Sequence, residues 1–393
     1  MTEENMQSNE ETPIKKNAAR RFPFSIYFAL VVTFAVIFSF YMNNKTTSDT
    51  VEFSVVGDIM THEPQIRAAY NNDCSCYDFA NTFDIIAPHL KADVILGNLE
   101  TTLPGSVLKF AGYPRFGAPD SLITALTKTG FNILTTANNH SVDKGKDGII
   151  RTLDVLDKYG IAHLGTYRSA EEHKQNRVLL VEKNNMKMAF LNYTFSTNGI
   201  EIPKSVVVNM VKKKKISADI AHAKTLKPDA IIVIYHFGTE YARQPDSYQK
   251  DIVNFTFKEG ADIVLGGHPH VLQPFKKLTV KDKYEETKDR FVIYSLGNFV
   301  SNQQRRYTDG GIILKFRLRK EEGVLVVDKI QYVPIWVHLQ VQDEKRSYTI
   351  LPVESYLKGE NSKTLSENAL KRMTLFYTDL TAHYKNVPVD KPE

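Results

Sequence analysis

Cysteine is nearly absent from this chain of 393 residues, whose only two thiols are Cys74 and Cys76. So few thiols exclude a disulfide-stapled miniprotein, and without a second cysteine cluster they cannot complete a four-cysteine zinc site. A bridge within a Cys-x-Cys step would close a cramped ring, so we expect no disulfide between these two residues and assign them no role. A metal pair or a redox switch is the less favoured alternative.

A dominant charge of either sign is also missing. Lys and Arg total 50 against 45 Asp and Glu, a net charge of +5, and no dense basic stripe points to nucleic acid as a partner. The chain has no G-x-S-x-G elbow, no Walker loop and no G-x-G-x-x-G turn, which are the usual signatures of serine hydrolases, P-loop NTPases and Rossmann enzymes. With 42% hydrophobic residues, the chain nevertheless has ample material for a folded core.

One hydrophobic run is long enough to cross a membrane. Residues 22–42 contain 21 amino acids without a charge, enough for a helix of about 30 Å. Basic residues crowd the stretch before this run and only Lys45 follows it closely, so the positive-inside rule predicts a cytoplasmic N-terminus. A cleavable signal peptide is the alternative, but the run is longer than usual and lacks a small-residue cleavage site. We therefore predict a single-pass cell-membrane protein with a cytoplasmic tail (1–21), an anchor (22–42), a linker (43–50) and an extracellular main domain.

Short apolar runs that stop abruptly at Gly, Asn, Asp or His recur after residue 51. Such runs lack polar alternation, which is typical of strands buried on both faces, and segments with helical spacing lie between several of them. The pattern predicts an α/β fold, in which ligands bind at the carboxyl ends of the strands. The runs cover residues 52–58, 93–100, 131–140, 230–238, 262–270 and 291–299.

The polar residues at these strand ends are the candidate site. Each alone has an ordinary explanation, because an Asp or Asn after a strand is usually a turn residue and a single His is usually hydrogen-bonded. Together they offer nitrogen and oxygen donors for a metal ion. In the His268-Pro269-His270 step, we expect Pro269 to keep the backbone extended, so that both histidines project to similar sides. The candidates are Asp58, Asn98, Glu100, Asn139, His140, His236, His268 and His270.

Six motifs, in this order, resemble those of the CapA/PgsA family of poly-γ-glutamate capsule-biosynthesis proteins. The resemblance covers about residues 51–302 and implies a membrane-anchored domain that works beside the membrane enzymes that make and export the polymer. That family in turn is similar to the calcineurin-like metallophosphoesterases, which implies a four-layered α/β/β/α sandwich with a two-metal site. The motifs are GDIMTH (57–62), GNLE (97–100), ANNH (137–140), YHFGTEY (235–241), GGHPH (266–270) and YSLGNF (294–299).

The resemblance also implies a role for individual residues. It makes Asp58 and His270 ligands of a first metal, and it assigns His140 to the leaving group. The ligands that it implies for a second metal are Asn139, His236 and His268. The cofactor would be one or two divalent ions, with Mn, Zn or Fe as candidates.

Two departures from the family pattern affect the first metal. Met60 stands where the first motif has a histidine, and Asn98 replaces the metal-bridging aspartate. Glu100 could bridge or bind in its place, and His62 could partly substitute for the lost imidazole.

Beyond residue 302 the sequence alternates between apolar and polar residues, which predicts antiparallel strands, and it closes with a helical pattern; residues 303–393 should complete the domain. The expected function is that of a membrane-anchored extracellular component of poly-γ-glutamate capsule biosynthesis and export. The alternatives are a cell-surface metal-dependent phosphoesterase unrelated to capsule, or a non-catalytic scaffold of the export complex. The expected partners are other membrane proteins of that complex. An anionic polymer is a further candidate, and its natural contacts would be Arg305, Arg306 and the run Lys212 to Lys215, although we favour a solvated helix face or loop for the lysine run.

Overall fold

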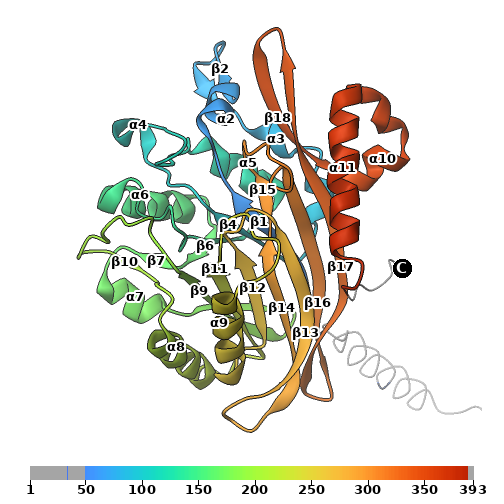
Figure 1. The fold of residues 1–393 in the computed structure, drawn as a ribbon. Coiled ribbons are helices and arrows are strands. Elements are labelled where there is room, and N and C mark those ends of the chain that lie inside the picture. The colour runs from blue at the N-terminus through green and yellow to red at the C-terminus, as the bar shows by residue number, and fades with distance from the viewer. Residues whose placement is uncertain (1–32, 34–48, 388–393) are drawn as a thin grey trace, which may run out of the picture. The chain divides into compact units, whose positions relative to one another are not determined.

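Two β-sheets, one of eight strands and one of six, organise the part of the chain that the computed structural model describes, Thr33 and residues 49–387 (Figure 1). The first sheet is mixed: β1, β4, β5 and β6 run parallel, and β16 joins β1 in the antiparallel sense. In spatial order its strands are β18 (Lys345–Pro352), β17 (Val324–Gln342), β16 (Gly310–Glu321), β1 (Thr50–Ile59), β4 (Val94–Leu99), β5 (Ile133–Thr135) and β6 (Ala162–Leu164), with β15 (Asn298–Val300) paired to β1.

The second sheet has four parallel strands at its centre and an antiparallel strand at each edge. Its order is β13 (Leu272–Lys281), β14 (Thr287–Leu296), β12 (Ile263–Gly267), β11 (Ala230–His236), β9 (Met186–Thr194) and β8 (Leu179–Lys183). Two short ladders lie apart from both sheets: β10 (Val207–Val208) pairs with β7 (Thr166–Tyr167), and β2 (Tyr70–Asn71) pairs with β3 (Cys76–Tyr77).

The two sheets pack face to face, and their facing side chains form one hydrophobic core. Phe53 of β1 stacks on Phe316 of β16 at 4.6 Å between ring centroids and contacts Phe190 of β9 at 6.4 Å. The outer face of the first sheet is covered by α3 (Ala80–Phe83), the 3-10 turn η1 (Ala87–Leu90), α5 (Ser121–Thr129) and α6 (Gly145–Lys158), and that of the second by α8 (Lys213–Thr225) and α9 (Ser247–Lys258). The strands are apolar on both sides because each sheet lies between two packed layers, and the expected α/β architecture is present.

Strands and helices also follow residue 302. β16, β17 and β18 form an antiparallel meander that extends the first sheet beyond β1. The side chains of Phe376 and Leu380 share the core with Trp336 of β17, and α11 lies along that strand (Figure 1). The helical elements here are α10 (Val353–Lys358), η2 (Glu360–Thr364) and α11 (Glu367–His383).

The expectation about the cysteines was wrong, because Cys74 and Cys76 form a disulfide. Their Cα atoms are 5.2 Å apart, within the ordinary range for a bridge. Ser75 between them has a φ of 51°, in the left-handed region, so the chain folds back sharply enough to bring the two side chains together. The expectation assumed a backbone without such a turn. The bridge joins the turn of the β2–β3 hairpin to the first residue of β3.

The remaining short helices are α2 (Glu63–Ala68), α4 (Gly105–Leu108) and α7 (Ala170–Asn176). In the described part of the chain, no helix combines the length and the hydrophobicity that a membrane span requires. The predicted anchor, residues 22–42, lies outside that part except for Thr33.

Candidate metal centre

The polar strand ends predicted from the sequence meet at one place, where the carboxyl ends of the central strands of both sheets converge. Asp58 and Asn98 lie near the ends of β1 and β4 in the first sheet, and His236 is the last residue of β11 in the second. The other candidates lie in the loops that follow β4, β5 and β12. All eight are buried, with Asp58 and Glu100 fully inaccessible: Asp58, Asn98, Glu100, Asn139, His140, His236, His268 and His270.

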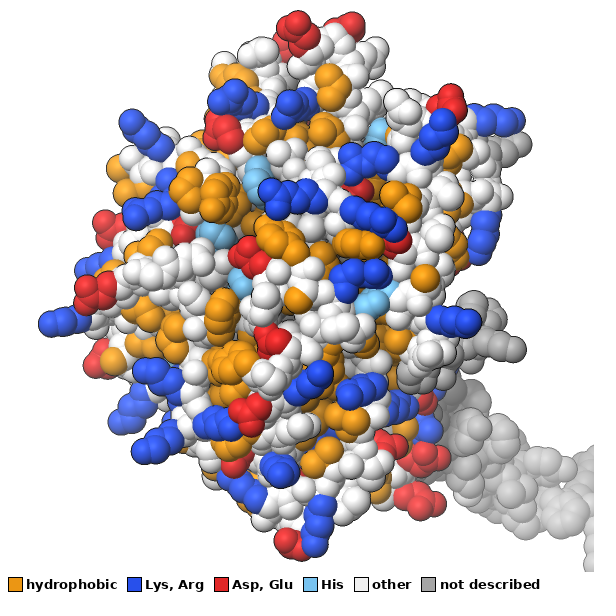
Figure 2. All heavy atoms as spheres, viewed as in Figure 1, with side chains coloured by type: hydrophobic (Ala, Val, Ile, Leu, Met, Phe, Trp, Pro, Cys, Tyr) orange, Lys and Arg blue, Asp and Glu red, His pale blue; other side chains and the backbone are white. Residues whose placement is uncertain are grey.

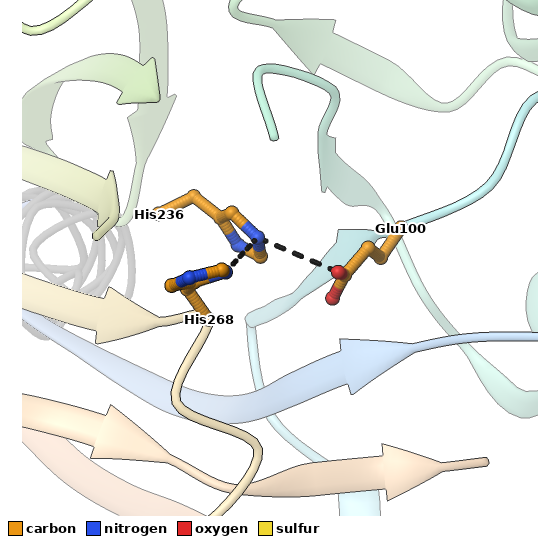
Figure 3. Close-up of side chains that lie close together, drawn as sticks. All are labelled: Glu100, His236 and His268. Carbon is orange, nitrogen blue, oxygen red and sulfur yellow. Dashed lines mark hydrogen bonds and ion pairs between the residues drawn. The ribbon is translucent and has the colours of Figure 1, made fainter. Parts of the chain in front are cut away.

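Glu100 lies at the centre of this cluster, and neither of its carboxylate oxygens has a hydrogen-bond partner. Its Oε1 is 3.5 Å from His236 Nε2 and 3.9 Å from His270 Nε2. Figure 3 shows how the Glu100 carboxylate and the His236 and His268 rings point toward one another. A buried carboxylate without hydrogen bonds is costly unless a cation compensates it, so this group fits a metal ion.

Two sets of ligand atoms share Glu100. One set combines it with His236 and His268, the other with Asp58 and His270, and in each set the ligand atoms lie within 4.8 Å of one another. The side-chain oxygen of Asn139, Oδ1, offers a further metal ligand to the first set and lies 2.7 Å from His236 Nε2. Imidazole and carboxylate donors in such numbers suit Zn, Mn or Fe, and the shared Glu100 would place two ions next to each other.

A single protonated histidine offsets only part of the negative charge of the second set. Burial by itself raises the pKa of Asp58, but the hydrogen bond with His270 and the neighbouring imidazoles lower it more, so it lies well below its usual value. Burial lowers the pKa of His270, yet Glu100 and Asp58 together raise it to about 9. A proton on His270 therefore compensates the Asp58 carboxylate that it contacts, a bound metal would displace that proton, and the Glu100 carboxylate still lacks a partner.

His268 is held in the neutral form that binds metals. Burial, with the nearby His236 and His270, keeps its pKa well below the usual value. Its backbone N–H donates to Asp58 Oδ2 at 3.2 Å, which ties the β12 loop to β1.

The backbone around Pro269 is not extended, contrary to the expectation from sequence. His268 has a φ of 98° and His270 a φ of 57°, both in the left-handed region that non-glycine residues seldom adopt. Strain of this kind persists where the surrounding structure enforces it, often at functional sites. The two left-handed residues bend the backbone on either side of Pro269, and each ring joins a different Glu100 set.

Asn98 is occupied as a hydrogen-bond donor. Its Nδ2 donates to Asp58 Oδ1 at 2.8 Å and lies 3.1 Å from His236 Nδ1, while its Oδ1 accepts from Asn138 at 3.2 Å. The amide thus orients one residue of each ligand set. Where the family resemblance places a bridging aspartate, this chain has a positioning amide, and the nearby Glu100 offers the shared carboxylate.

His140 is oriented by an aspartate that the sequence analysis missed. Its Nδ1 lies 2.7 Å from Asp143 Oδ2, and because a carboxylate can only accept, Nδ1 carries the proton. The Phe116 backbone N–H also donates to Asp143 Oδ2, at 2.6 Å, and the Phe116 ring packs edge-on against the imidazole. His140 Nε2 is left facing Glu100 Oε1 at 3.9 Å. In the sequence, the spacing of three residues between His140 and Asp143 within ANNHSVD could have indicated this pair.

Two further residues were missed. Asn298 Oδ1 lies 3.1 Å from His270 Nδ1, and the exposed carboxylate of Glu240 lies with His268 and His270 in a third group able to hold an ion. Both belong to motifs that the sequence analysis quoted, YSLGNF and YHFGTEY. Asn298 follows a strand and a glycine as Asp58 and Asn98 do, so the same pattern could have found it, whereas Glu240 lies four residues beyond the end of β11.

His62 and Met60 lie in the wall of the site. Both line a cavity of about 850 Å³ that also reaches Asn139, His140 and His270. His62 Nδ1 accepts a hydrogen bond from the Asn302 backbone N–H at 3.2 Å, and among the described residues it belongs to none of the groups able to hold a metal. Figure 2 shows one face of the molecule, on which histidines lie close to Lys and Arg side chains.

The sequence matches the family described as bacterial capsule synthesis protein PGA_cap over residues 52–303. The chain belongs to this family. Among curated capsule synthesis relatives, it is 28% identical to the capsule biosynthesis protein CapA of Bacillus anthracis over 295 residues, which is 72% of this chain and 67% of that one. It is 24% identical to the PGA biosynthesis protein CapA of Bacillus subtilis over 325 residues, 80% of either chain.

Solved structures similar to this chain include the NAD nucleotidase of Haemophilus influenzae, with 15% identity, a TM-score of 0.47 and coverage of 88% of this chain and 64% of that one. A putative 5'-nucleotidase from Staphylococcus aureus has the same identity and TM-score and covers 84% of this chain and 58% of that one. The chain thus spans less than two thirds of either solved protein.

Proposed function

We propose that this capsule synthesis family member is an outward-facing, membrane-anchored component of poly-γ-glutamate capsule biosynthesis and export, and that its main domain is a metal-dependent hydrolase of the metallophosphoesterase type. The names of the two Bacillus relatives support the polymer. The uncharged run at 22–42, with its basic flank, supports the anchor and the orientation.

The observation that carries the hydrolase proposal is the unpartnered carboxylate of Glu100, shared between two sets of metal-ligand atoms. Asp58 and His270 would hold one divalent ion, and His236, His268 and Asn139 the other. When bound, such ions polarise a phosphoryl oxygen and lower the pKa of water enough for it to act as a nucleophile.

His140 supplies the proton transfer in this scheme. With Nδ1–H fixed by Asp143, a second proton on Nε2 can pass to the leaving oxygen, and the carboxylate stabilises the positive charge of the imidazolium. Phe116 excludes water from one side of the ring. The low exposure of all these groups strengthens each electrostatic interaction within the site.

Metal analysis of the purified full chain, combined with hydrolysis of a generic phosphodiester, tests the proposal. We expect bound Mn, Zn or Fe in the wild type and its loss in His236→Ala and His268→Ala, because each variant removes a ligand. His222→Ala, in the last turn of α8 and outside the ligand sets, is the matched control. Unchanged metal stoichiometry in both ligand variants would refute the metal centre.

The anchor and the capsule role need experiments in cells. Protease added to intact cells should digest residues 51–393, and protection of this region until the membrane is opened would contradict the orientation. Capsule polymer should be lost in cells that express only the anchorless chain. Intact capsule in His140→Ala cells would favour a non-catalytic scaffold, to which the Met60 replacement of a family histidine also points.

A further inference from the structure

Two arginines from separate loops line the cavity over the metal centre. Arg115 lies between α4 and α5, and Arg305 lies between β15 and β16. Both are exposed, and within residues 49–387 neither guanidinium forms an ion pair or donates a side-chain hydrogen bond. The Arg305 guanidinium lies 5.8 Å from the centre of the Tyr241 ring. Two such cations in one concave site leave their donors free for a ligand.

Several basic residues outside this cavity are already engaged in ion pairs. Arg306, next to Arg305, makes a two-pronged ion pair with Asp379 at 2.7 and 2.8 Å. In the lysine run at 212–215, Lys213 pairs with Asp251 at 2.7 Å and Lys215 with Asp219 at 3.1 Å. Because a paired cation must give up its partner before it binds a ligand, the polymer contacts expected at Arg306 and at the lysine run are less available than Arg305.

The rest of the cavity wall can accommodate an elongated, negatively charged ligand. Glu240 is the one carboxylate among the lining residues, and it lies beside His268 and His270 at the metal end. Gln304 also lines the cavity, and its amide nitrogen has no hydrogen-bond partner among the described residues. The volume of about 850 Å³ is in the upper part of the range for sites that hold a whole small molecule.

We propose that Arg115 and Arg305 form a subsite for a chain that carries several oxyanions, and that this subsite feeds such a chain to the metal centre. The guanidinium group binds carboxylates and phosphates alike through paired N–H donors, so both γ-linked glutamate and a phosphate chain have the required chemistry. The inference rests on the proposed function, since it names the substrate class for the same cavity.

The test is binding to the full chain, kept in detergent and EDTA so that no metal contributes. The probes are a γ-linked glutamate oligomer and inorganic tripolyphosphate, and the binding of each is measured separately, by fluorescence of the labelled oligomer and by calorimetry for tripolyphosphate. We expect Arg115→Ala and Arg305→Ala each to weaken binding about tenfold, as the loss of a charge-assisted hydrogen bond does, and added salt to weaken wild-type binding further. The control is Arg306→Ala, which removes a neighbouring guanidinium that is paired with Asp379. This variant should bind the probes as tightly as the wild type.

Binding of both probes, or of either one alone, supports the subsite if it depends on Arg115 and Arg305, and the preferred probe identifies the source of the oxyanions. The subsite is overturned if neither probe binds, if both arginine variants bind like the wild type, or if Arg306→Ala weakens binding equally. Because EDTA removes metals, these results do not depend on the metal centre. Conversely, loss of the metal centre would show in the stoichiometry of His236→Ala and His268→Ala, which the arginines do not influence.

Discussion

Replacement of Glu100 by Gln isolates the contribution of the shared carboxylate. The substitution keeps the shape of the side chain but removes the one ligand common to both sets. At a metal concentration of about 100 times the dissociation constant, binding stabilises the folded state by about 2.7 kcal/mol. Unfolding of about 340 residues has an entropy of about 0.7 kcal/mol/K, so the wild type should gain about 4 °C in Tm on metal addition.

The variant should lose most of this gain. If its affinity falls about 100-fold, the same metal concentration stabilises it by only about 0.4 kcal/mol, less than about 1 °C. Without metal its Tm should equal or exceed that of the wild type, because an unpaired buried charge has been removed. Differential scanning fluorimetry with and without Mn²⁺ or Zn²⁺ measures both effects, and Glu182→Gln, which neutralises an exposed carboxylate, is the control.

Two outcomes would refute this reasoning. A full metal-induced gain in Glu100→Gln would mean that the carboxylate is not a ligand. A large drop in its metal-free Tm would mean that Glu100 serves the folded state through contacts other than those described.

Three more predictions follow from the same geometry. His140→Ala should lower kcat for a phosphodiester by about 10² to 10⁴-fold while the metal content stays unchanged. Asp143→Asn should shift the pH profile of kcat, because Asp143 orients the His140 ring. A kcat of His140→Ala equal to that of the wild type would exclude the role of His140 as an acid. Gly267→Ala should weaken metal binding in a titration without removing a ligand, because the added Cβ would lie 2.8 Å from Asp58 Oδ1; an unchanged affinity would show that Asp58 tolerates displacement. Burial keeps the pKa of His62 at about 4, below its usual 6.5, so the unfolded state takes up a proton first as the pH falls and stability drops between about pH 6.5 and 4. The free energy of unfolding, measured with urea at several pH values, should therefore fall less in His62→Gln than in the wild type, by on the order of 2 kcal/mol. Identical dependence of the unfolding free energy on pH in the two proteins would contradict the assignment.

The strand pattern and most site residues could be predicted from the sequence because both depend on short-range information. A strand buried on both faces is apolar at every position, and the polar residue that ends it is visible in the same run. This is how Asp58, Asn98 and His236 were found. His268 and His270 were found in the same way, although the conformation expected around Pro269 was wrong: the left-handed turns there are imposed by packing against β1 and the cluster, which no local preference indicates.

The sequence by itself determined which elements form and which polar groups stand at their ends. Only the tertiary structure decided which of those groups meet. Glu100 follows a strand of the first sheet and His236 ends a strand of the second, and they come within 3.5 Å because the two sheets stack with these ends aligned. Pairing within the first sheet, where β4, β15 and β16 all lie against β1, brings the loops of Arg115 and Arg305, 190 residues apart in sequence, to one cavity. The orientation of the Asn98 amide and the Cys74–Cys76 bridge were also beyond the sequence, because hydrogen-bond direction and backbone handedness depend on neighbours that only the folded chain supplies.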